Sequence, residues 1–284
     1  MSPETQTAPA VPSESKCATC PVHNASELRR LGVNMDRWDF VVALMGNPNT
    51  GKSTVFNALT GLRQHVGNWV GKTVSRAEGG FRLAETNYKL VDLPGTYSLV
   101  SSSHHEEVAR DFLLFGQPDV TVVVVDATRL ERNLILVLQV LEITGRVVVA
   151  LNLMDEARRH GLEVDARDLT RQLGVPVVPM SARRGEGIRE LLQAIDEVAK
   201  GRFVPRPRRL DHQDPRLEAA LRRILPEIEA AFPHLPNARW VALRLLDGDH
   251  SIIRAIEEGS LGDIDRMAAK ALPDLRAREL TEEN

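Results

Sequence analysis

The chain has 284 residues and a net charge of −3, with 43% hydrophobic and 26% charged residues, as in a soluble globular protein of one or two domains. The balanced charge excludes a bulk electrostatic grip on nucleic acid, and 4% aromatic content leaves few side chains for stacking on bases, so no nucleic-acid partner is expected. No apolar run approaches the roughly 18–20 residues that cross a bilayer. The first residues also lack the basic start and apolar stretch of a secretory signal.

The expected elements alternate between strands and helices. Residues 1–15 are rich in Pro, Ser, Thr and Glu and are predicted to be disordered, and a short helix is expected within 24–37. Near-continuous apolar runs suit strands buried on both faces of a parallel sheet; they cover residues 39–45, 120–125, 147–151 and 175–179. Helical patterns cover 52–60, 106–115, 130–143, 165–173 and 188–200, and residues 81–83 and 88–91 alternate as a hairpin. The pattern predicts an α/β fold with a doubly wound, mostly parallel sheet flanked by helices.

The character of the chain changes after residue 200. A Pro- and Arg-rich stretch, GRFVPRPRRLDHQDP, is a candidate linker, and helical periodicity alone follows it, over 216–232, 239–246, 251–257 and 263–275. We therefore expect three parts: a flexible N-terminal extension over 1–37, an α/β domain over 38–203 and a small all-helical domain over 204–284.

Residues 46–54 carry the strongest motif. GNPNTGKS matches G-x-x-x-x-G-K-[ST] and lies between an apolar strand and a helix, the context that identifies a phosphate-binding P-loop. Glycines let backbone N–H groups close around phosphates, a lysine reaches the β- and γ-phosphates, and a serine hydroxyl suits Mg²⁺. The predicted nucleotide contacts here are Gly46, Asn47, Pro48, Asn49, Thr50, Gly51, Lys52, Ser53 and Thr54.

Three further motifs end successive expected strands, where the crevice of an α/β sheet lies. In the first, Asp92-Leu93-Pro94-Gly95, the carboxylate would hold a Mg²⁺ water and the Gly95 N–H would meet a γ-phosphate. The second, Asn152-Leu153-Met154-Asp155, offers a carboxylate that accepts two hydrogen bonds from guanine, a donor pair that adenine lacks. The third, Ser181-Ala182-Arg183, would bring backbone N–H groups to guanine O6.

These motifs together resemble a P-loop GTPase of the translation-factor-related class. DLPGTYSL, GNWVGKTV and RWVALRLLDGD add a resemblance, over residues 39–275, to the cytosolic part of the FeoB ferrous iron transport family. The resemblance implies a GTP-hydrolysing G domain, then a helical spacer that tunes nucleotide binding, and in the family a membrane permease follows. Such a chain would work in the cytoplasm, at the inner face of the membrane, beside the permease and small accessory Feo proteins, with a homo-oligomer left open. A ribosome-assembly GTPase and a non-catalytic GTP/GDP-sensing module are the alternatives.

Two departures from common GTPases bear on activity. Leu153 stands where most carry Lys, so modest nucleotide affinity is expected, and Thr96 stands where Ras-like proteins carry a water-orienting Gln, so slow intrinsic hydrolysis is expected. In related K⁺-activated GTPases an Asn at the position of Asn49 helps to hold a cation near the β/γ bridge. We therefore predict K⁺ stimulation through Asn49, the alternative being that Asn49 only fits the loop.

The stretch VGNWVGKTV, residues 66–74, reads as neither helix nor strand and occupies the place of a first switch loop. Thr73 would close on Mg²⁺ when the γ-phosphate is present, with Gly67 and Gly71 giving backbone freedom. Asn49, Lys52, Thr73 and Gly95 are thus the predicted catalytic residues, and Ser53, Thr73 and, through water, Asp92 the predicted Mg²⁺ ligands. Trp69 would either shield the site or pack on the next strand.

Two other clusters have weaker readings. Cys17, Cys20 and His23 have spacing suited to Zn²⁺ or Fe²⁺, to a reversible dithiol, or to free thiols in a reducing cytosol. In the run SSSHHEE, residues 101–107, the His and Glu side chains could form a metal cluster, but a helix cap by Ser103 with Glu106 three residues on is favoured.

Overall fold

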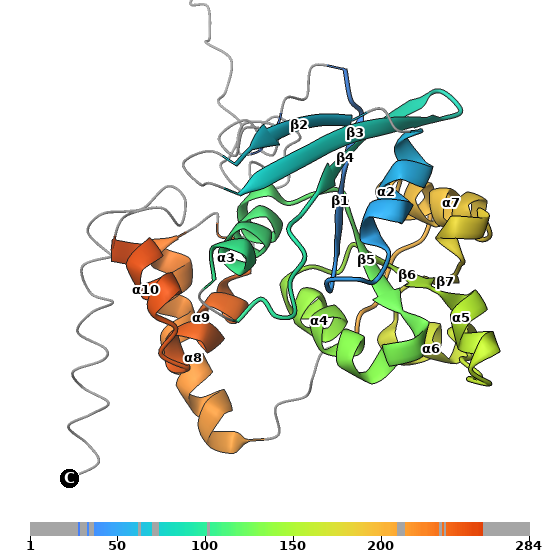
Figure 1. Ribbon diagram of the computed structural model, residues 1–284. Helices are drawn as coiled ribbons and strands as arrows, with labels where there is room; N and C mark the ends of the chain where they lie inside the picture. The colour runs from blue at the N-terminus through green and yellow to red at the C-terminus, as the bar shows by residue number, and fades with distance from the viewer. Residues whose placement is uncertain are drawn as a thin grey trace, which may run out of the picture.

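The computed structural model describes residues 28, 33, 37–61, 64–69, 74–100, 103–208, 214–232, 235 and 237–257. Figure 1 shows a twisted sheet with helices on both faces and a group of helices, drawn in orange and red, beside α3. Cys17, Cys20, His23, Gly71, Thr73 and the helix expected at 263–275 lie outside the described residues, as does most of 24–37.

The sheet has seven strands in the order β2-β3-β4-β1-β5-β6-β7. β1 pairs in parallel with β4 and β5, and β5, β6 and β7 continue in parallel, while β2-β3 and β3-β4 are antiparallel. This confirms the predicted doubly wound, mostly parallel sheet. The strands are β1 (Phe40–Gly46), β2 (Gln64–Asn68), β3 (Ser75–Leu83), β4 (Thr86–Asp92), β5 (Val120–Asp126), β6 (Val147–Asn152) and β7 (Val177–Pro179).

The central strands are buried on both faces because their side chains alternate between two apolar cores. In β1, Val41, Ala43 and Met45 belong to one core, and Val42 and Leu44 belong to the other. The second core is closed by α2 (Lys52–Thr60) and α7 (Ile188–Ala199), through residues such as Phe56 and Ile195.

The first core lies under the remaining helices of the α/β unit. It is closed by α3 (His104–Asp111), the π-helical turn η2 (Phe112–Gly116) and α4 (Leu130–Ile143). Shorter elements complete this unit: the 3₁₀ turns η3 (Ala127–Arg129) and η4 (Ala182–Arg184), and the helices α5 (Met154–Arg159) and α6 (Ala166–Leu173).

Within the described residues, three helices follow the linker: α8 (Pro215–Ala231), α9 (Ala238–Leu246) and α10 (His250–Glu257). Their buried residues, among them Leu221, Ile228 and Trp240, join the same core as α3 and α4. The Asn237 side chain, at the start of α9, donates to the Ile143 carbonyl at the end of α4, with N···O 3.0 Å. The helical part therefore rests on the α/β unit through a shared core and a polar joint.

Part of the stretch 66–74 is strand, which corrects the prediction that it forms neither helix nor strand. Residues 66–68 belong to β2, which pairs only with β3, at the edge of the sheet. Val66 is 71% exposed, so the sequence of β2 carries no apolar pattern typical of a buried strand. The strand forms through main-chain pairing with β3. The hairpin formed by β3 and β4 is likewise longer than predicted, and α5 was not predicted.

Candidate functional site

The carboxyl ends of four parallel strands lie together at one end of the sheet. Leu44 is paired with Asp92, Gly46 with Val124, and Asp126 with Asn152. This end is therefore marked by Gly46, Asp92, Asp126 and Asn152. Leu151 pairs with Pro179, so Ser181 follows β7 beside Asn152, and all four predicted motifs lie at this end of the sheet.

The P-loop joins β1 to α2 in a conformation that needs its glycines. Asn49 and Gly51 both have left-handed backbones, with φ of 67° and 82°. A Cβ on Gly51 would lie 2.4 Å from Asn152 Nδ2, and one on Gly46 would lie 2.5 Å from the Val124 carbonyl oxygen. The Thr50 hydroxyl closes the turn by donating to the Asn47 carbonyl at 2.9 Å. Ser53 and Thr54 lie exposed in the first turn of α2, whose N-terminus favours anions.

Lys52 contacts the Asp92 carboxylate across the site. Burial raises the pKa of Asp92 above its usual range, and the Lys52 charge opposes that rise only in part. The segment after Asp92 is tied to β1 and the P-loop, since the Leu93 N–H donates to Leu44 at 2.9 Å and the Thr96 N–H donates to Gly46 at 3.3 Å. A Cβ on Gly95 would lie 3.6 Å from Pro48, so Gly95 faces the P-loop directly.

Asn152 joins the P-loop to the loop after β7. Its side-chain amide donates to the Thr50 carbonyl at 2.9 Å, and its side-chain oxygen accepts from the Ala182 N–H at 3.0 Å. Leu153 follows in a left-handed conformation, with φ 62°. The side chains of Leu93, Met154 and Ala182 lie in the two cores, so any contact these residues make with a ligand would come from the backbone.

Asp155 stands beside Ser181 and Arg184. The Asp155 N–H donates to the Ser181 hydroxyl at 3.1 Å, and Arg184 Nε lies 3.2 Å from the Asp155 carboxylate. Burial acts to raise the pKa of Asp155, but the Ser181 side chain and the Arg184 charge outweigh it, so the pKa lies below its usual range. Arg183 was the arginine predicted at this loop, but the ion pair with Asp155 is made by the neighbouring Arg184.

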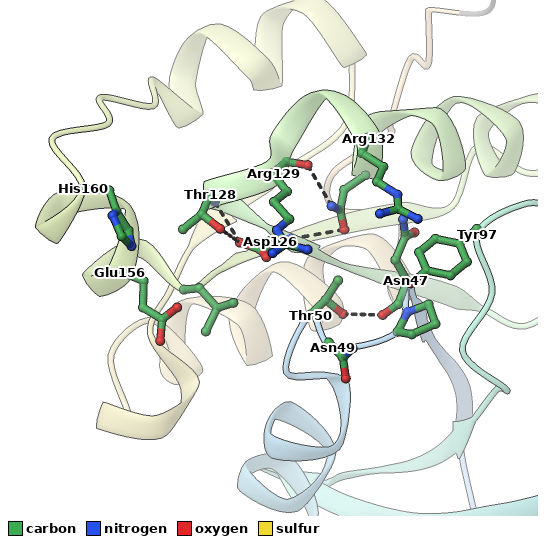
Figure 2. A pocket seen from close by; sticks show the side chains of 13 residues that line it. Asn47, Asn49, Thr50, Tyr97, Asp126, Thr128, Arg129, Arg132, Glu156 and His160 are labelled. Atoms are coloured by element: carbon green, nitrogen blue, oxygen red, sulfur yellow. Dashed lines mark hydrogen bonds between the residues drawn. The ribbon is translucent and has the colours of Figure 1, made fainter.

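A cavity of about 360 Å³ adjoins the P-loop (Figure 2). Asn47, Pro48, Asn49 and Thr50 line one side, and the other wall comes from η3, α4 and α5. Most residues of this second wall were not predicted as site residues. Asp126 has a signal in the sequence, because it ends a parallel strand. Besides Leu153, the wall and rim consist of Tyr97, Asp126, Thr128, Arg129, Arg132, Asn133, Glu156 and His160.

Thr96 is turned away from solvent. It is 3% exposed, and its hydroxyl donates to the Ser98 carbonyl at 2.6 Å and accepts from the Ser98 N–H at 3.2 Å. This hydroxyl is therefore engaged within its own turn.

Trp69 packs into the first core. It is 4% exposed, and its ring meets Phe112 of η2 edge-on, with centroids 5.4 Å apart. The Trp69 main-chain N–H donates to the Val74 carbonyl at 3.0 Å, so the pairing of β2 with β3 continues to these two residues. Ala77 pairs with Asp92, so the start of β3 lies at the same end of the sheet as the carboxyl end of β4.

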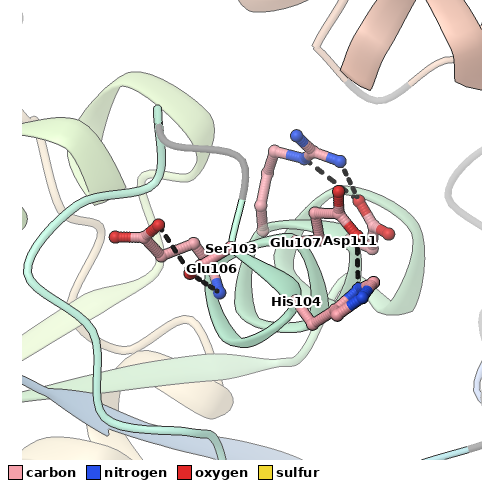
Figure 3. Close-up of polar contacts among 6 residues, drawn as sticks. Ser103, His104, Glu106, Glu107 and Asp111 are labelled. Carbon is pink, nitrogen blue, oxygen red and sulfur yellow. Dashed lines mark hydrogen bonds and ion pairs between the residues drawn. The ribbon is translucent and has the colours of Figure 1, made fainter. Parts of the chain in front are cut away.

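The SSSHHEE run contains a helix cap. The Ser103 hydroxyl accepts from the Glu106 N–H at 3.3 Å and donates to the Glu106 carboxylate at 2.7 Å (Figure 3). His104 pairs with Glu107 at 3.4 Å, one turn along the helix. Among the described residues, no group of three or more His, Cys, Asp or Glu could hold a metal ion, so the capping prediction is supported here.

Comparison with known proteins identifies both parts of the chain. The family model for ferrous iron transport protein B matches residues 40–195, and that for the FeoB cytosolic helical domain matches 214–282. The Fe(2+) transporter FeoB of Shigella flexneri is 42% identical over 214 residues, and that of Salmonella typhimurium is 43% identical over 212. Each alignment covers 73% of this chain and 27% of the relative, so the chain spans about a quarter of these transporters.

Solved structures agree in fold. The cytosolic domain of T. maritima FeoB in a GDP form matches with TM-score 0.71 and 37% identity, over 86% of this chain and 96% of that one. The cytosolic domain of L. pneumophila FeoB matches with TM-score 0.69 and 34% identity, over 85% and 96%. Within the described part of the chain, no helix is both long and apolar enough to span a membrane. The chain belongs to the ferrous iron transport protein B family and carries its P-loop GTPase G domain followed by its helical domain.

Proposed function

We propose that this chain binds and hydrolyses GTP and that its nucleotide state regulates ferrous iron uptake. The observation that carries the proposal is the pair of contacts made by Asn152, to the Thr50 carbonyl and the Ala182 N–H. These contacts fix the phosphate loop relative to Asp155. Burial acts to raise the pKa of Asp155, but the Ser181 side chain and the Arg184 charge lower it, so the pKa lies below its usual range. An ionised carboxylate at that place accepts both donors of guanine and leaves adenine unpaired.

The phosphates would lie in the P-loop, against Lys52 and the backbone N–H groups of the α2 N-terminus. The donor set suits Mg²⁺, since Ser53 offers an exposed hydroxyl and Asp92 a carboxylate, both hard oxygen ligands. Mg²⁺ would neutralise charge on the β- and γ-phosphates when bound. Thr73, which lies outside the described residues, is the further proposed Mg²⁺ ligand, and Gly95 would offer its N–H to the γ-phosphate.

Asn49 is the candidate K⁺ ligand. It is exposed, lines the cavity beside the P-loop and has its backbone held in the left-handed region, with φ 67°. Its exposed amide oxygen would be available to a monovalent cation. K⁺ would supply the positive charge that an arginine supplies in other GTPases.

Attachment to a membrane permease would couple this cycle to transport. The curated relatives are Fe(2+) transporters about four times as long as the matched region. The chain would then work at the inner face of the membrane, with the permease as its partner and with small accessory Feo proteins and a second copy as further partners. Release of Thr73 and Gly95 after hydrolysis would change the loops at the sheet edge.

Guanine selectivity is tested by exchanging the base-reading group. Asp155→Asn replaces an acceptor oxygen by an N–H donor, which suits the O2 oxygen of xanthine and repels the guanine amine. We expect GTP affinity to fall by about two orders of magnitude and XTP affinity to rise, measured by fluorescent-nucleotide titration. Unchanged GTP binding would contradict the proposed role of Asp155, and Glu163→Gln, the same acid-to-amide exchange at an exposed position outside the site, is the control.

Hydrolysis and the K⁺ effect are tested in one series. GTP turnover is measured at equal ionic strength in K⁺ and in Na⁺, for the native chain and for Asn49→Ala. We expect K⁺ to raise the rate in the native chain only. Equal rates in both salts would remove K⁺ from the mechanism.

A non-catalytic sensing module is the second candidate, because the Thr96 hydroxyl is engaged with Ser98 and no glutamine takes its place. Single-turnover measurements with excess protein separate the two functions. Bound GTP that stays intact over hours in K⁺ would favour the sensing module.

A further inference from the structure

The segment that follows Gly95, residues 96–100, rests on one face of α4. The Leu99 N–H donates to Gln139 Oε1 at 2.8 Å, and Gln139 Nε2 donates to the Ser98 hydroxyl at 3.3 Å. The Arg132 guanidinium lies over the Tyr97 ring, 4.4 Å from its centroid. Figure 2 shows Tyr97 and Arg132 side by side at the rim of the cavity. Arg132 and Gln139 are seven residues apart, two turns on the same face of the helix.

The segment is also ordered within itself. Thr96 is held by Ser98 through its hydroxyl, and the Val100 N–H donates to the Ser98 hydroxyl at 3.0 Å. Leu99 is buried in the first core. At its other end the Thr96 N–H reaches Gly46 of the P-loop at 3.3 Å. The segment therefore forms a short bridge from α4 to the P-loop, with Gly95 at its inner end.

This bridge matters because the Thr96 side chain is engaged elsewhere. Because position 96 carries no glutamine to orient the attacking water, hydrolysis depends more strongly on how exactly the Gly95 backbone is placed against the γ-phosphate. A backbone group can orient a reactant only as precisely as its segment is held, and a displacement of about 1 Å can lower a rate by about 10²-fold.

We propose that Gln139 and Arg132 of α4 are positioning residues for GTP hydrolysis, which hold residues 97–99 and thereby fix the backbone of Gly95 and Thr96. The inference rests on the proposed function and adds the residues that hold the backbone next to Gly95 in place. Gln139 is the stronger anchor, since it is half-buried and makes two hydrogen bonds, whereas Arg132 and Tyr97 are exposed.

The test combines hydrogen exchange with single-turnover kinetics on the full chain. In Gln139→Ala we expect faster amide exchange over residues 97–100 in the nucleotide-free protein and in the GDP complex. We also expect roughly a ten- to hundredfold slower single-turnover hydrolysis, with the GDP dissociation constant unchanged within about threefold. Gln139→Glu keeps the oxygen that accepts from Leu99 and should recover part of both losses. Arg132→Lys loses the planar stack on Tyr97 and should show a smaller effect.

The control is Ile135→Ala, an exposed position on α4 outside these contacts, which should leave exchange and rate as in the native chain. Unchanged exchange at Leu99 in Gln139→Ala would overturn the anchoring. Faster exchange with native hydrolysis would reduce Gln139 to a structural role and overturn its positioning role. Failure of the native chain to hydrolyse GTP in K⁺ would instead overturn the proposed function, and the exchange measurement would still report whether α4 holds the segment.

Discussion

At the scale of single residues, Asn152 does more than its place in a base-recognition motif indicates. It is 1% exposed and uses both ends of its side chain, one on the P-loop and one on the loop after β7. Two loops that are far apart in the chain are thereby held in register. Gly51 allows this contact, because a side chain there would collide with the Asn152 amide.

Asn152→Ala should therefore affect both stability and binding. It leaves the Thr50 carbonyl and the Ala182 N–H without this partner, at a cost of about 1–3 kcal/mol in the free energy of unfolding. Affinity for GTP and GDP should fall together, since the site loses its preset geometry. Urea denaturation and nucleotide titration measure the two effects. Asn152→Asp, which keeps the acceptor for Ala182 and loses the donor, should be intermediate in stability; equal stability of all three proteins would contradict the joint.

At the scale of elements, the β2–β3 hairpin is fastened to η2 through Trp69, the residue after β2. The Trp69 ring meets Phe112 edge-on, and the Arg76 guanidinium lies 5.3 Å from the Trp69 ring centroid. These contacts fix the end of β2 and the start of β3 against the first core. Of the two roles considered for Trp69, shielding the site or packing, the structure supports packing, with the contact made to η2.

Two substitutions at Trp69 separate packing from hydrogen bonding. The buried indole N–H has no hydrogen-bond partner among the described residues, so Trp69→Phe removes an unsatisfied donor while keeping an aromatic ring. We expect Trp69→Phe to cost less than about 1.5 kcal/mol and Trp69→Ala about 3–5 kcal/mol in the free energy of unfolding. Chemical denaturation followed by far-UV circular dichroism measures both. Similar losses in the two variants would show that the indole N–H makes a contact that matters.

Much of this architecture could be predicted from the sequence because apolar strands and short motifs are both made of neighbouring residues. Strands such as β1 and β5 are apolar without interruption, which only burial on both faces explains, and the four motifs occur in the chain order that the crevice requires. The edge strand β2 gives no such signal, since its side chains face solvent. The roles of Gln139 and Arg184 depend on partners 40 and 29 residues away in the chain, and no spacing rule relates such distant positions.

At the scale of the whole molecule, the helical part is bound to the α/β unit at the end of α4, the same helix that holds residues 97–99. Asn237 donates to the carbonyls of Glu142 and Ile143 in the last turn of α4. The same side chain caps α9 by accepting from the Trp240 N–H at 3.2 Å. One residue therefore joins the two parts and also starts a helix, and α4 lies between the helical part and the segment after Gly95.

Substitution of Asn237 separates these two roles. Asn237→Asp keeps the oxygen that caps α9 but loses the donor, and it places a negative charge at the negative end of the α4 dipole. Asn237→Ala loses both the cap and the joint, at about 1 kcal/mol for the cap and about 1–3 kcal/mol for the lost hydrogen bonds to α4. If the joint dominates, Asn237→Asp should be at least as destabilising as Asn237→Ala, and added salt should reduce its loss by screening the new charge. Thermal unfolding at low and high salt measures this. A native-like Asn237→Asp would show that the cap alone matters and that the shared core holds the two parts together.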